Sequence, residues 1–432
     1  MKTLTPDQRA DFVAAKRKEV ENYFANSVWE FAADGEQQQS DRHGRVITAR
    51  WVLTWKCDET AEFPVWKAKA RLVLRGYEDP DVMSLSKASP TASRQARPWL
   101  LTTATWKCWI VVGADVKAAF LSGSNFDRII LVKLPLDCGP PTWSLCPGHW
   151  TTCLHAPEED AYGLSDAPLP WYQEASKRLE GLGWLKHHLD QCCFLLTTKD
   201  KANPGGVLIG MLILHVDDSL VSGSATNPVF KSALEDLRKA FDFGKWDTLT
   251  KKQHVKYCGC TILMNDHGLE VSYANYMKRV CPMTIAKGRR DDQEITEQEK
   301  SKARGLIGAL QWPTTQGMPM LAASMSIQAG ELSGAKVRLL LELNKTLHFG
   351  KANCDVNIKF LAKKQQPDAS FDDLVLVCYA DAAFCVRSDK TSQGIHPCCL
   401  RQFRLEGQQS ARIDCWLAIL QVATCLQIIF GS

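Results

Sequence analysis

Runs of apolar residues along the chain predict a mixture of strands and helices. Apolar runs bounded by polar residues predict strands over 110–114, 206–214 and 219–221, with further strands around 255–262, 269–272 and 374–379. Apolar positions at helical spacing predict helices over 1–35 (with Phe12, Val20, Phe24, Val28 and Phe31 on the apolar side), 93–106, 171–182, 227–241 and 303–347, and 134–157 is predicted to be a loop. Because strands and helices do not strictly alternate, the pattern favours the α+β class.

Aspartates stand at the ends of these predicted strands. Asp115 follows the strand 110–114, and His215-Val216-Asp217-Asp218 separates the strands 206–214 and 219–221. Neighbouring residues of an extended strand point to opposite faces, so Asp217 and Asp218 can act together only where the backbone turns. The pattern therefore predicts a hairpin tip. Three carboxylates can clamp two divalent ions about 3.5–4 Å apart, which is the arrangement that two-metal nucleotidyl transfer requires.

Each of these aspartates also has a plainer interpretation. An Asp-Asp pair between apolar runs is most often a solvated hairpin turn. A single aspartate at a strand end is usually a helix cap or a turn residue. Only the conjunction of Asp115 with Asp217 and Asp218, together with the motifs described below, favours a metal site.

Length and composition place loose bounds on the chain. Its 432 residues exceed one ordinary core and predict two or three domains, and the apolar (45%) and charged (23%) fractions are those of globular proteins. The net charge of +4 neither supports nor excludes nucleic acid. Residues 42–75, however, carry eight Lys or Arg against three acids, and cationic and apolar residues alternate over 66–75. This stretch predicts a strand with one face for phosphates, or alternatively a solvated edge strand protected by lysines.

The seventeen cysteines are expected to be reduced, because no secretory signal begins the chain. Metal binding by cysteine is not expected, since the neighbouring pairs lack CxxC spacing: Cys192-Cys193, Cys258 with Cys260, and Cys398-Cys399. The apolar segment 416–430 is interrupted by Gln421 and Gln427 and is too short for a membrane span, so no membrane anchor is expected. Localisation stays open between cytoplasm and nucleus.

Several motifs occur in an order and spacing that resemble copia-type retrotransposon reverse transcriptases. They are Lys69-Ala70-Arg71-Leu72-Val73-Leu74-Arg75-Gly76, Ser89-Pro90-Thr91, Asp115-Val116-Lys117-Ala118-Ala119-Phe120, Tyr162-Gly163-Leu164, Ala167-Pro168, Trp171-Tyr172, His215-Val216-Asp217-Asp218, Leu306-Ile307-Gly308-Ala309-Leu310-Gln311-Trp312 and Tyr379-Ala380-Asp381-Ala382. The resemblance covers nearly the whole chain from about Lys16 onward.

The resemblance implies a right-hand polymerase that is part of a Pol polyprotein. After an N-terminal helix and loop (1–41), fingers, palm and thumb are expected over 42–302, a connection region over 303–370 and a truncated ribonuclease-H-like α/β end over 371–432. The implied activity is RNA-directed DNA synthesis with Mg²⁺ or Mn²⁺. The implied partners are an RNA or DNA template with its primer, and dNTPs. The oligomeric state is not fixed by the sequence.

The resemblance also implies roles for individual residues. Asp115, Asp217 and Asp218 would be the catalytic metal carboxylates. Three cations would grip the incoming triphosphate, and an aromatic gate would select deoxynucleotides: Lys69, Arg71 and Arg75, with Phe120 as the gate. A core phenylalanine is the alternative for Phe120. In the ribonuclease-H-like end, Asp381 would be the first acid and Asp414 the second.

The chain departs from the family in several places. His215 replaces the usual tyrosine, and Ser165-Asp166-Ala167-Pro168-Leu169 stands where many members have Lys-Gln-Ala-Pro-Arg. Gly317-Met318-Pro319-Met320 replaces a familiar Arg-Pro-Asp, and the expected glutamate and last acidic motif of ribonuclease H are not evident, so little or no such activity is expected. The alternatives are a decayed relic that only binds nucleic acid and, more weakly, a nuclease built on Asp381 with Asp414.

Overall fold

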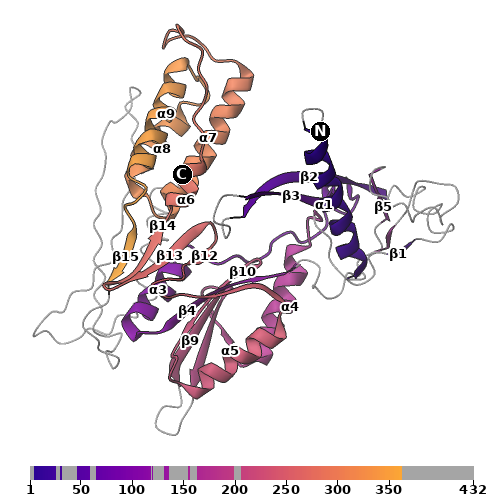
Figure 1. Ribbon diagram of the computed structural model, residues 1–432, viewed down its shortest axis with the longest axis vertical. Helices are drawn as coiled ribbons and strands as arrows, with labels where there is room; N and C mark the ends of the chain where they lie inside the picture. Colours follow the sequence, from indigo (N-terminus) through magenta and orange to yellow (C-terminus); the bar gives the residue numbers. More distant parts are fainter. Residues whose placement is uncertain are drawn as a thin grey trace, which may run out of the picture. The chain divides into compact units, whose positions relative to one another are not determined.

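The structure is a computed structural model that describes residues 4–25, 30–31, 46–58, 65–117, 119, 131–135, 154–155, 163–198 and 206–361 (Figure 1). The chain divides into two compact units. The first comprises residues 1–96, 114–221 and 226–246, and the second comprises 97–113, 222–225 and 247–432. The predicted strand 374–379, Asp381 and Asp414 lie outside the described residues.

A three-stranded sheet in the first unit contains the basic stretch. Its strands are β2 (Val46–Asp58), β3 (Val65–Leu74) and β5 (Leu131–Lys133), in the order β3-β2-β5. Strand β2 is antiparallel to β3 and parallel to β5. Ala70, Leu72 and Leu74 of β3 are buried, whereas Lys67 and Arg71 are exposed. The predicted alternation of cationic and apolar residues is therefore confirmed as a two-faced strand.

Helix α1 (Pro6–Ala25) packs against this sheet, as Figure 1 shows. Phe12 and Val20 are buried as predicted, and the Phe12 ring contacts Trp55 edge-on with 4.8 Å between ring centroids. The prediction of a helix to residue 35 is wrong. The helix ends at Ala25, and Glu30–Phe31 form strand β1, which pairs with β6 (Leu154–His155) inside the predicted loop. Local periodicity cannot indicate such a pairing of distant segments.

Most of a six-stranded sheet belongs to the first unit. Its order is β11-β4-β10-β9-β8-β7, with β4 (Ile110–Val116), β7 (Leu185–Lys186), β8 (Cys193–Thr198), β9 (Val207–His215), β10 (Asp218–Gly223) and β11 (Phe243–Thr248). Helices α4 (Pro168–Gly181) and α5 (Pro228–Ala240) confirm the helices predicted over 171–182 and 227–241. Helix α5 begins where Asn227 Oδ1 accepts from the backbone N–H groups of Val229 and Phe230. Its Phe230 ring packs so closely on Gly210 that a Cβ there would lie 2.8 Å from the ring.

The second unit combines an antiparallel sheet with helices. The sheet order is β12-β13-β14-β15, formed by β12 (Val255–Tyr257), β13 (Cys260–Asn265), β14 (Gly268–Ser272) and β15 (Ile358–Leu361). The helices are α3 (Ala96–Lys107), α6 (Ala274–Arg279), α7 (Glu297–Gln316), α8 (Ala322–Gly330) and α9 (Val337–Ala352). Short 3₁₀ turns occur at η1 (Gly76–Glu78) in the first unit and η4 (Pro319–Leu321) in the second.

Helix α7 begins earlier than the sequence predicts. Thr296 and Glu299 form a reciprocal capping box that starts the helix at Glu297. The predicted domain boundary between residues 302 and 303 therefore lies inside a continuous helix, and the domain division stays a prediction. Within the described residues, no helix is both long and apolar enough to cross a bilayer.

A buried arginine joins three elements of the second unit. Arg97 on α3 donates from Nη2 to the Tyr273 hydroxyl (2.7 Å) and to the Gln316 carbonyl oxygen (3.0 Å). Its Nη1 lies 3.5 Å from the Cys260 sulfur. Burial raises the pKa of the Tyr273 hydroxyl, which stays a neutral partner. Arg97 thus ties α3 to the sheet and to the end of α7.

The turn between β12 and β13 places glycine where only glycine fits well. Cys258 and Gly259 lie between the paired residues Tyr257 and Cys260, with φ of +43° and +77°. Both values are left-handed, as a two-residue hairpin turn of type I′ requires. A Cβ at Gly259 would lie 3.0 Å from the Trp312 ring.

Replacing this glycine should measure the packing of Trp312. We expect Gly259→Ala to lower the free energy of unfolding by about 2–4 kcal/mol, combining left-handed strain with overpacking. Gly288→Ala is the matched control, because Gly288 has a φ of +79° but nothing within 4 Å of its Cβ position. It should lower that free energy by only about 1–2 kcal/mol in urea melts. Equal losses would contradict the close contact with Trp312.

Candidate active site

Two of the predicted site aspartates meet at one end of the six-stranded sheet. Asp115 is the penultimate residue of β4, Asp217 lies in the turn between β9 and β10, and Asp218 is the first residue of β10. The backbone N–H of Val116 donates to the carbonyl oxygen of Asp217 (2.9 Å). The Ser219 hydroxyl donates to the carbonyl oxygen of Ala114 (3.2 Å). The predicted hairpin tip is confirmed, and it lies beside the end of β4.

The tip itself is a strained turn with a dedicated support. Val216 has a φ of +60°, a left-handed conformation that costs a β-branched residue about 1–2 kcal/mol. Its carbonyl oxygen accepts from the indole Nε1 of Trp171 (2.7 Å), and Trp171 is buried in the first turn of α4. This bond fixes the backbone that carries Asp217.

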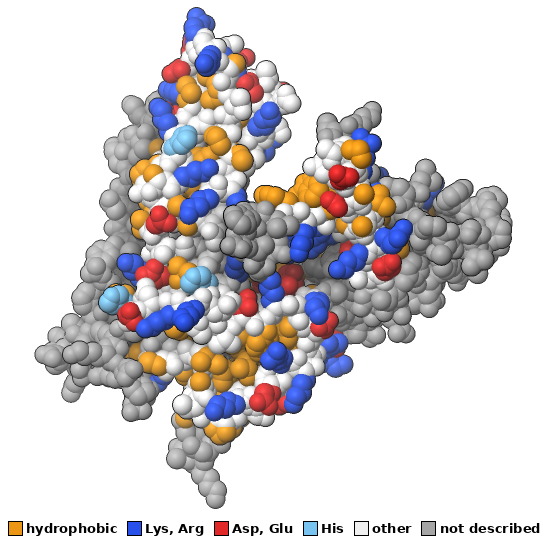
Figure 2. Space-filling view, viewed as in Figure 1, with side chains coloured by type: hydrophobic (Ala, Val, Ile, Leu, Met, Phe, Trp, Pro, Cys, Tyr) orange, Lys and Arg blue, Asp and Glu red, His pale blue; other side chains and the backbone are white. Residues whose placement is uncertain are grey.

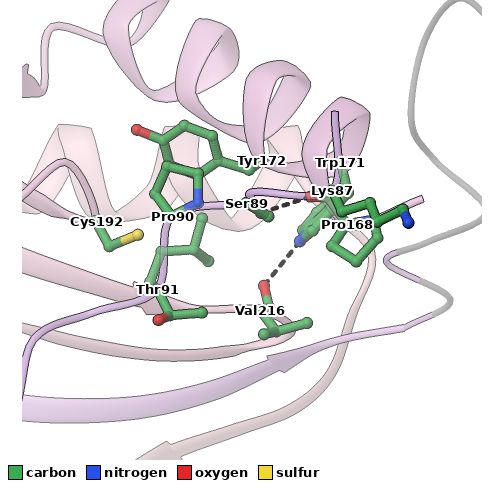
Figure 3. Close-up of a pocket in the computed structure, with 10 residues that line it drawn as sticks. Lys87, Ser89, Pro90, Thr91, Pro168, Trp171, Tyr172, Cys192 and Val216 are labelled. Carbon is green, nitrogen blue, oxygen red and sulfur yellow. Dashed lines mark hydrogen bonds between the residues drawn. The ribbon is translucent and has the colours of Figure 1, made fainter. Parts of the chain in front are cut away.

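A cavity of about 250 Å³ borders this support (Figure 3). Pro90, Thr91, Trp171 and Tyr172 line it together with Val216. Ser89 and Pro168 also line it, and the Ser89 hydroxyl donates to the carbonyl oxygen of Pro168 (2.9 Å). Figure 3 shows this hydrogen bond and the one from Trp171 to Val216. The motifs around residues 89–91 and 167–172 are thus brought together under the turn.

The carboxylates at the tip repel each other. Burial raises the pKa of Asp115, and the negative charge of Asp217 raises it further, against the opposing charges of Lys56, Lys245 and Lys69. At His215, burial lowers the pKa of the imidazole, and the nearby charge of Asp217 opposes that shift. A cation between Asp115 and Asp217 would relieve their repulsion.

The donor set fits a hard divalent cation in part. Carboxylate oxygens are the ligands that Mg²⁺ prefers, and Asp115 and Asp217 supply them near enough for the charge of Asp217 to raise the pKa of Asp115. Within the part of the chain that the structure describes, no group of three or more His, Cys, Asp or Glu side chains is arranged to hold a metal. Asp218 as a third ligand therefore stays a prediction.

Five cations share one face of the β2–β3 hairpin. In the register of the two strands, Lys67, Lys69 and Arg71 lie on the face opposite the buried Leu72. Lys56, opposite Lys67, and Arg50, opposite Val73, share that face. This cationic face consists of Arg50, Lys56, Lys67, Lys69 and Arg71. Figure 2 shows Lys and Arg side chains along the lower border of β2 and β3.

The cationic face is crowded with like charges. Lys56 lies directly opposite Lys67, a pairing that destabilises a sheet unless an anion compensates it. Burial lowers the pKa of Lys69, as do the charges of Arg71 and Lys56, while Glu19 and Asp115 oppose the shift. The face therefore adjoins Asp115 and suits a polyanion.

Arg75 differs from the other predicted triphosphate ligands. Its Nη1 donates to Glu78 Oε1 (3.3 Å), and its backbone N–H donates to the carbonyl oxygen of Thr48 (2.8 Å). Glu78 Oε2 in turn accepts from the backbone N–H and the hydroxyl of Thr48, each at 2.7 Å. Arg75 thus has a structural role at the end of β3, and its binding role stays a prediction.

Some site residues lie outside the described part of the chain, and others were not predicted. Phe120, Asp381 and Asp414 are outside the described residues. Sequence reasoning missed Lys245 and Glu19, whose charges act on Asp115 and Lys69, and it missed the support that Trp171 gives to the turn. No local pattern marks Lys245, because it is near Asp115 only through the adjacency of β11 and β4.

Comparisons with known proteins agree with the motifs. A family model described as "Reverse transcriptase (RNA-dependent DNA polymerase)" matches residues 37–287. The chain is 25% identical over 283 residues to the Retrovirus-related Pol polyprotein from transposon RE2 of Arabidopsis thaliana, covering 62% of this chain and 18% of that protein. It is 24% identical over 230 residues to the corresponding protein from transposon RE1, covering 52% and 14%. The chain thus spans less than a fifth of either relative.

The raised pKa of Asp115 should affect the free energy of unfolding. Because the folded-state pKa is raised, the ionised carboxylate destabilises the folded state above that pKa, and the penalty vanishes as the pH falls below the unfolded value. We expect Asp115→Asn to raise the free energy of unfolding by about 0.5–2 kcal/mol at neutral pH, and by little near pH 3.

Urea melts in EDTA at several pH values would measure this difference. Asp266→Asn is the control, since the side-chain hydrogen bond and charge of Lys251 hold the pKa of Asp266 low and no gain is expected there. A loss of stability in Asp115→Asn at neutral pH would contradict the assigned strain.

Proposed function

Because the chain belongs to the reverse transcriptase (RNA-dependent DNA polymerase) family, we propose that it extends a primer by nucleotidyl transfer from a dNTP. One observation carries the proposal: the backbone bond from Val116 to Asp217 holds the Asp115 and Asp217 carboxylates near each other at the β9–β10 turn. The cationic face lies next to them. The six-stranded sheet would be the palm and the β2–β3 hairpin part of the fingers. Other activities of a whole Pol polyprotein are not proposed for this chain.

The chemistry of the proposed step divides between carboxylates and cations. A bound Mg²⁺ or Mn²⁺ would lower the barrier by activating the primer 3′-hydroxyl and by stabilising charge on the departing pyrophosphate. Asp115 and Asp217 would hold it, with Asp218 as the proposed third ligand. Lys69 and Arg71 would bind the triphosphate, since ammonium and guanidinium groups match phosphate oxygens. Phe120 as the sugar gate rests on the family motif alone.

The proposed partners are a primer and its RNA or DNA template. Backbone phosphates of nucleic acid would add to the attraction of the cationic face, so binding should weaken as salt increases. A ribonuclease H activity at Asp381 and Asp414 is not part of the proposal, because both residues lie outside the described structure.

A second candidate is a protein that binds primer and template without synthesis. His215 favours it, because an imidazole whose pKa is lowered by burial stands next to the metal carboxylates where the family has tyrosine. Asp166 favours it too, because it has a structural role at the start of α4. Its carbonyl oxygen accepts from the Leu169 N–H, and an acidic residue there stabilises the helix dipole. Incorporation of a labelled nucleotide separates the two candidates.

Removing one carboxylate should abolish synthesis and spare binding. We expect Asp217→Asn to lower dTTP incorporation on poly(rA)/oligo(dT) by at least about a thousandfold, because the metal loses a ligand at the reacting phosphate. Filter binding of the same hybrid should change less than about twofold. Glu235→Gln, an exposed charge change on α5, should leave both unchanged. Equal incorporation by Asp217→Asn and wild type would disprove the assignment.

The cationic face predicts unequal effects of two similar substitutions. Lys69→Gln should raise the KM for dTTP about tenfold at nearly unchanged stability, since a charge near the triphosphate is lost. Arg75→Gln should instead lower the melting temperature, because it breaks the ion pair with Glu78. Steady-state kinetics and thermal melts on both variants measure this split. The reverse pattern would exchange the two roles.

A further inference from the structure

Strand β3 lies at the edge of its sheet, and its outer backbone groups need partners. In an antiparallel pair, the backbone groups of successive residues point alternately toward the neighbouring strand and away from it. Leu72, opposite Trp51, is a residue whose N–H and C=O point away from β2. An unpaired edge of this kind would be open to pairing with another chain.

Helix α1 supplies both partners. The Leu72 N–H donates to Glu19 Oε1 (3.4 Å), and the Tyr23 hydroxyl donates to the Leu72 carbonyl oxygen (2.8 Å). Tyr23 is fully buried, so this is a fixed contact of the helix with the strand edge. The hydrogen bond from the Leu72 N–H holds the Glu19 carboxylate at Leu72, the neighbour of Arg71 in β3.

The charge of Glu19 is more than the hydrogen bond needs. A glutamine oxygen would accept from Leu72 equally well without the cost of burying a charge. Burial raises the pKa of Glu19, while the Leu72 N–H and the charges of Lys69 and Arg71 oppose the shift. The negative charge of Glu19 in turn opposes the lowering of the Lys69 pKa. Helix α1 also precedes the span matched by the family model, residues 37–287.

We propose that Glu19 limits the affinity of the cationic face for polyphosphate by placing one negative charge at its edge, beside Arg71 and Lys69. The inference rests on the proposed function and deepens it. An uncompensated face would hold triphosphate and pyrophosphate more tightly, and release of pyrophosphate would slow. Glu19 is a positioning and tuning residue that acts through its neighbours, and it does not touch the reacting atoms.

The test is calorimetric titration of the full chain with inorganic tripolyphosphate in EDTA, without nucleic acid. Glu19→Gln keeps an acceptor for Leu72 and removes the charge, so the dissociation constant should fall about threefold. A merely structural role could only weaken binding. Glu21→Gln is the matched control, because it makes the same change on an exposed residue of the same helix and should alter the constant by less than about a factor of 1.5.

Three results with the glutamine variants would overturn the proposal: unchanged binding in Glu19→Gln, weaker binding in Glu19→Gln, or an equal gain in Glu21→Gln. Lys69→Gln should weaken binding, which assigns the titrated site to the cationic face. Glu19→Met also removes the charge and replaces the glutamine variant if that variant does not fold. No binding by wild type would overturn the inference, whereas failure of the polymerase proposal would appear separately as absent dTTP incorporation.

Discussion

The hydrogen bond between Trp171 Nε1 and the Val216 carbonyl oxygen is the contact on which the site geometry depends. Val216 is held in a conformation that its branched side chain disfavours, so the turn needs an external support. With the turn fixed, the Val116–Asp217 backbone bond sets the separation of Asp115 from Asp217. The positions of the Asp115 and Asp217 carboxylates thus depend on the indole of Trp171 in α4.

Like charges lie close together at two places in the first unit, and their repulsion lowers the stability of the fold. Two carboxylates repel each other at the end of β4, and two lysines face each other across β2 and β3. Each group taken alone would be less costly as a neutral residue. Cations and polyphosphate together would relieve both repulsions, which is why these charges favour binding over a solvated surface.

Local patterns predicted the elements well because each had its own signal. The apolar runs on both sides of Asp217 and Asp218 and the alternation over 66–75 gave the hairpin tip and the two-faced strand. Apart from the start of α7, which a local capping box sets, what failed or was missed depends on distant pairing. Phe31 joins a strand through residues 154–155, Lys245 reaches Asp115 through sheet order, and Glu19 reaches Leu72 along a strand edge. Ordering of strands leaves no trace in local spacing.

Arg97 has a consequence for how the second unit responds to acid. Its described partners are a phenol, a backbone carbonyl and a thiol, and none of them is a carboxylate, the group that takes up a proton as the pH falls from about 7 to about 4. An arginine anchored on carboxylates would lose its partners over that range. The joint between α3, the four-stranded sheet and α7 is therefore acid-tolerant, whereas burial and the charge of Asp217 raise the pKa of Asp115, so that this carboxyl takes up its proton sooner as the pH falls.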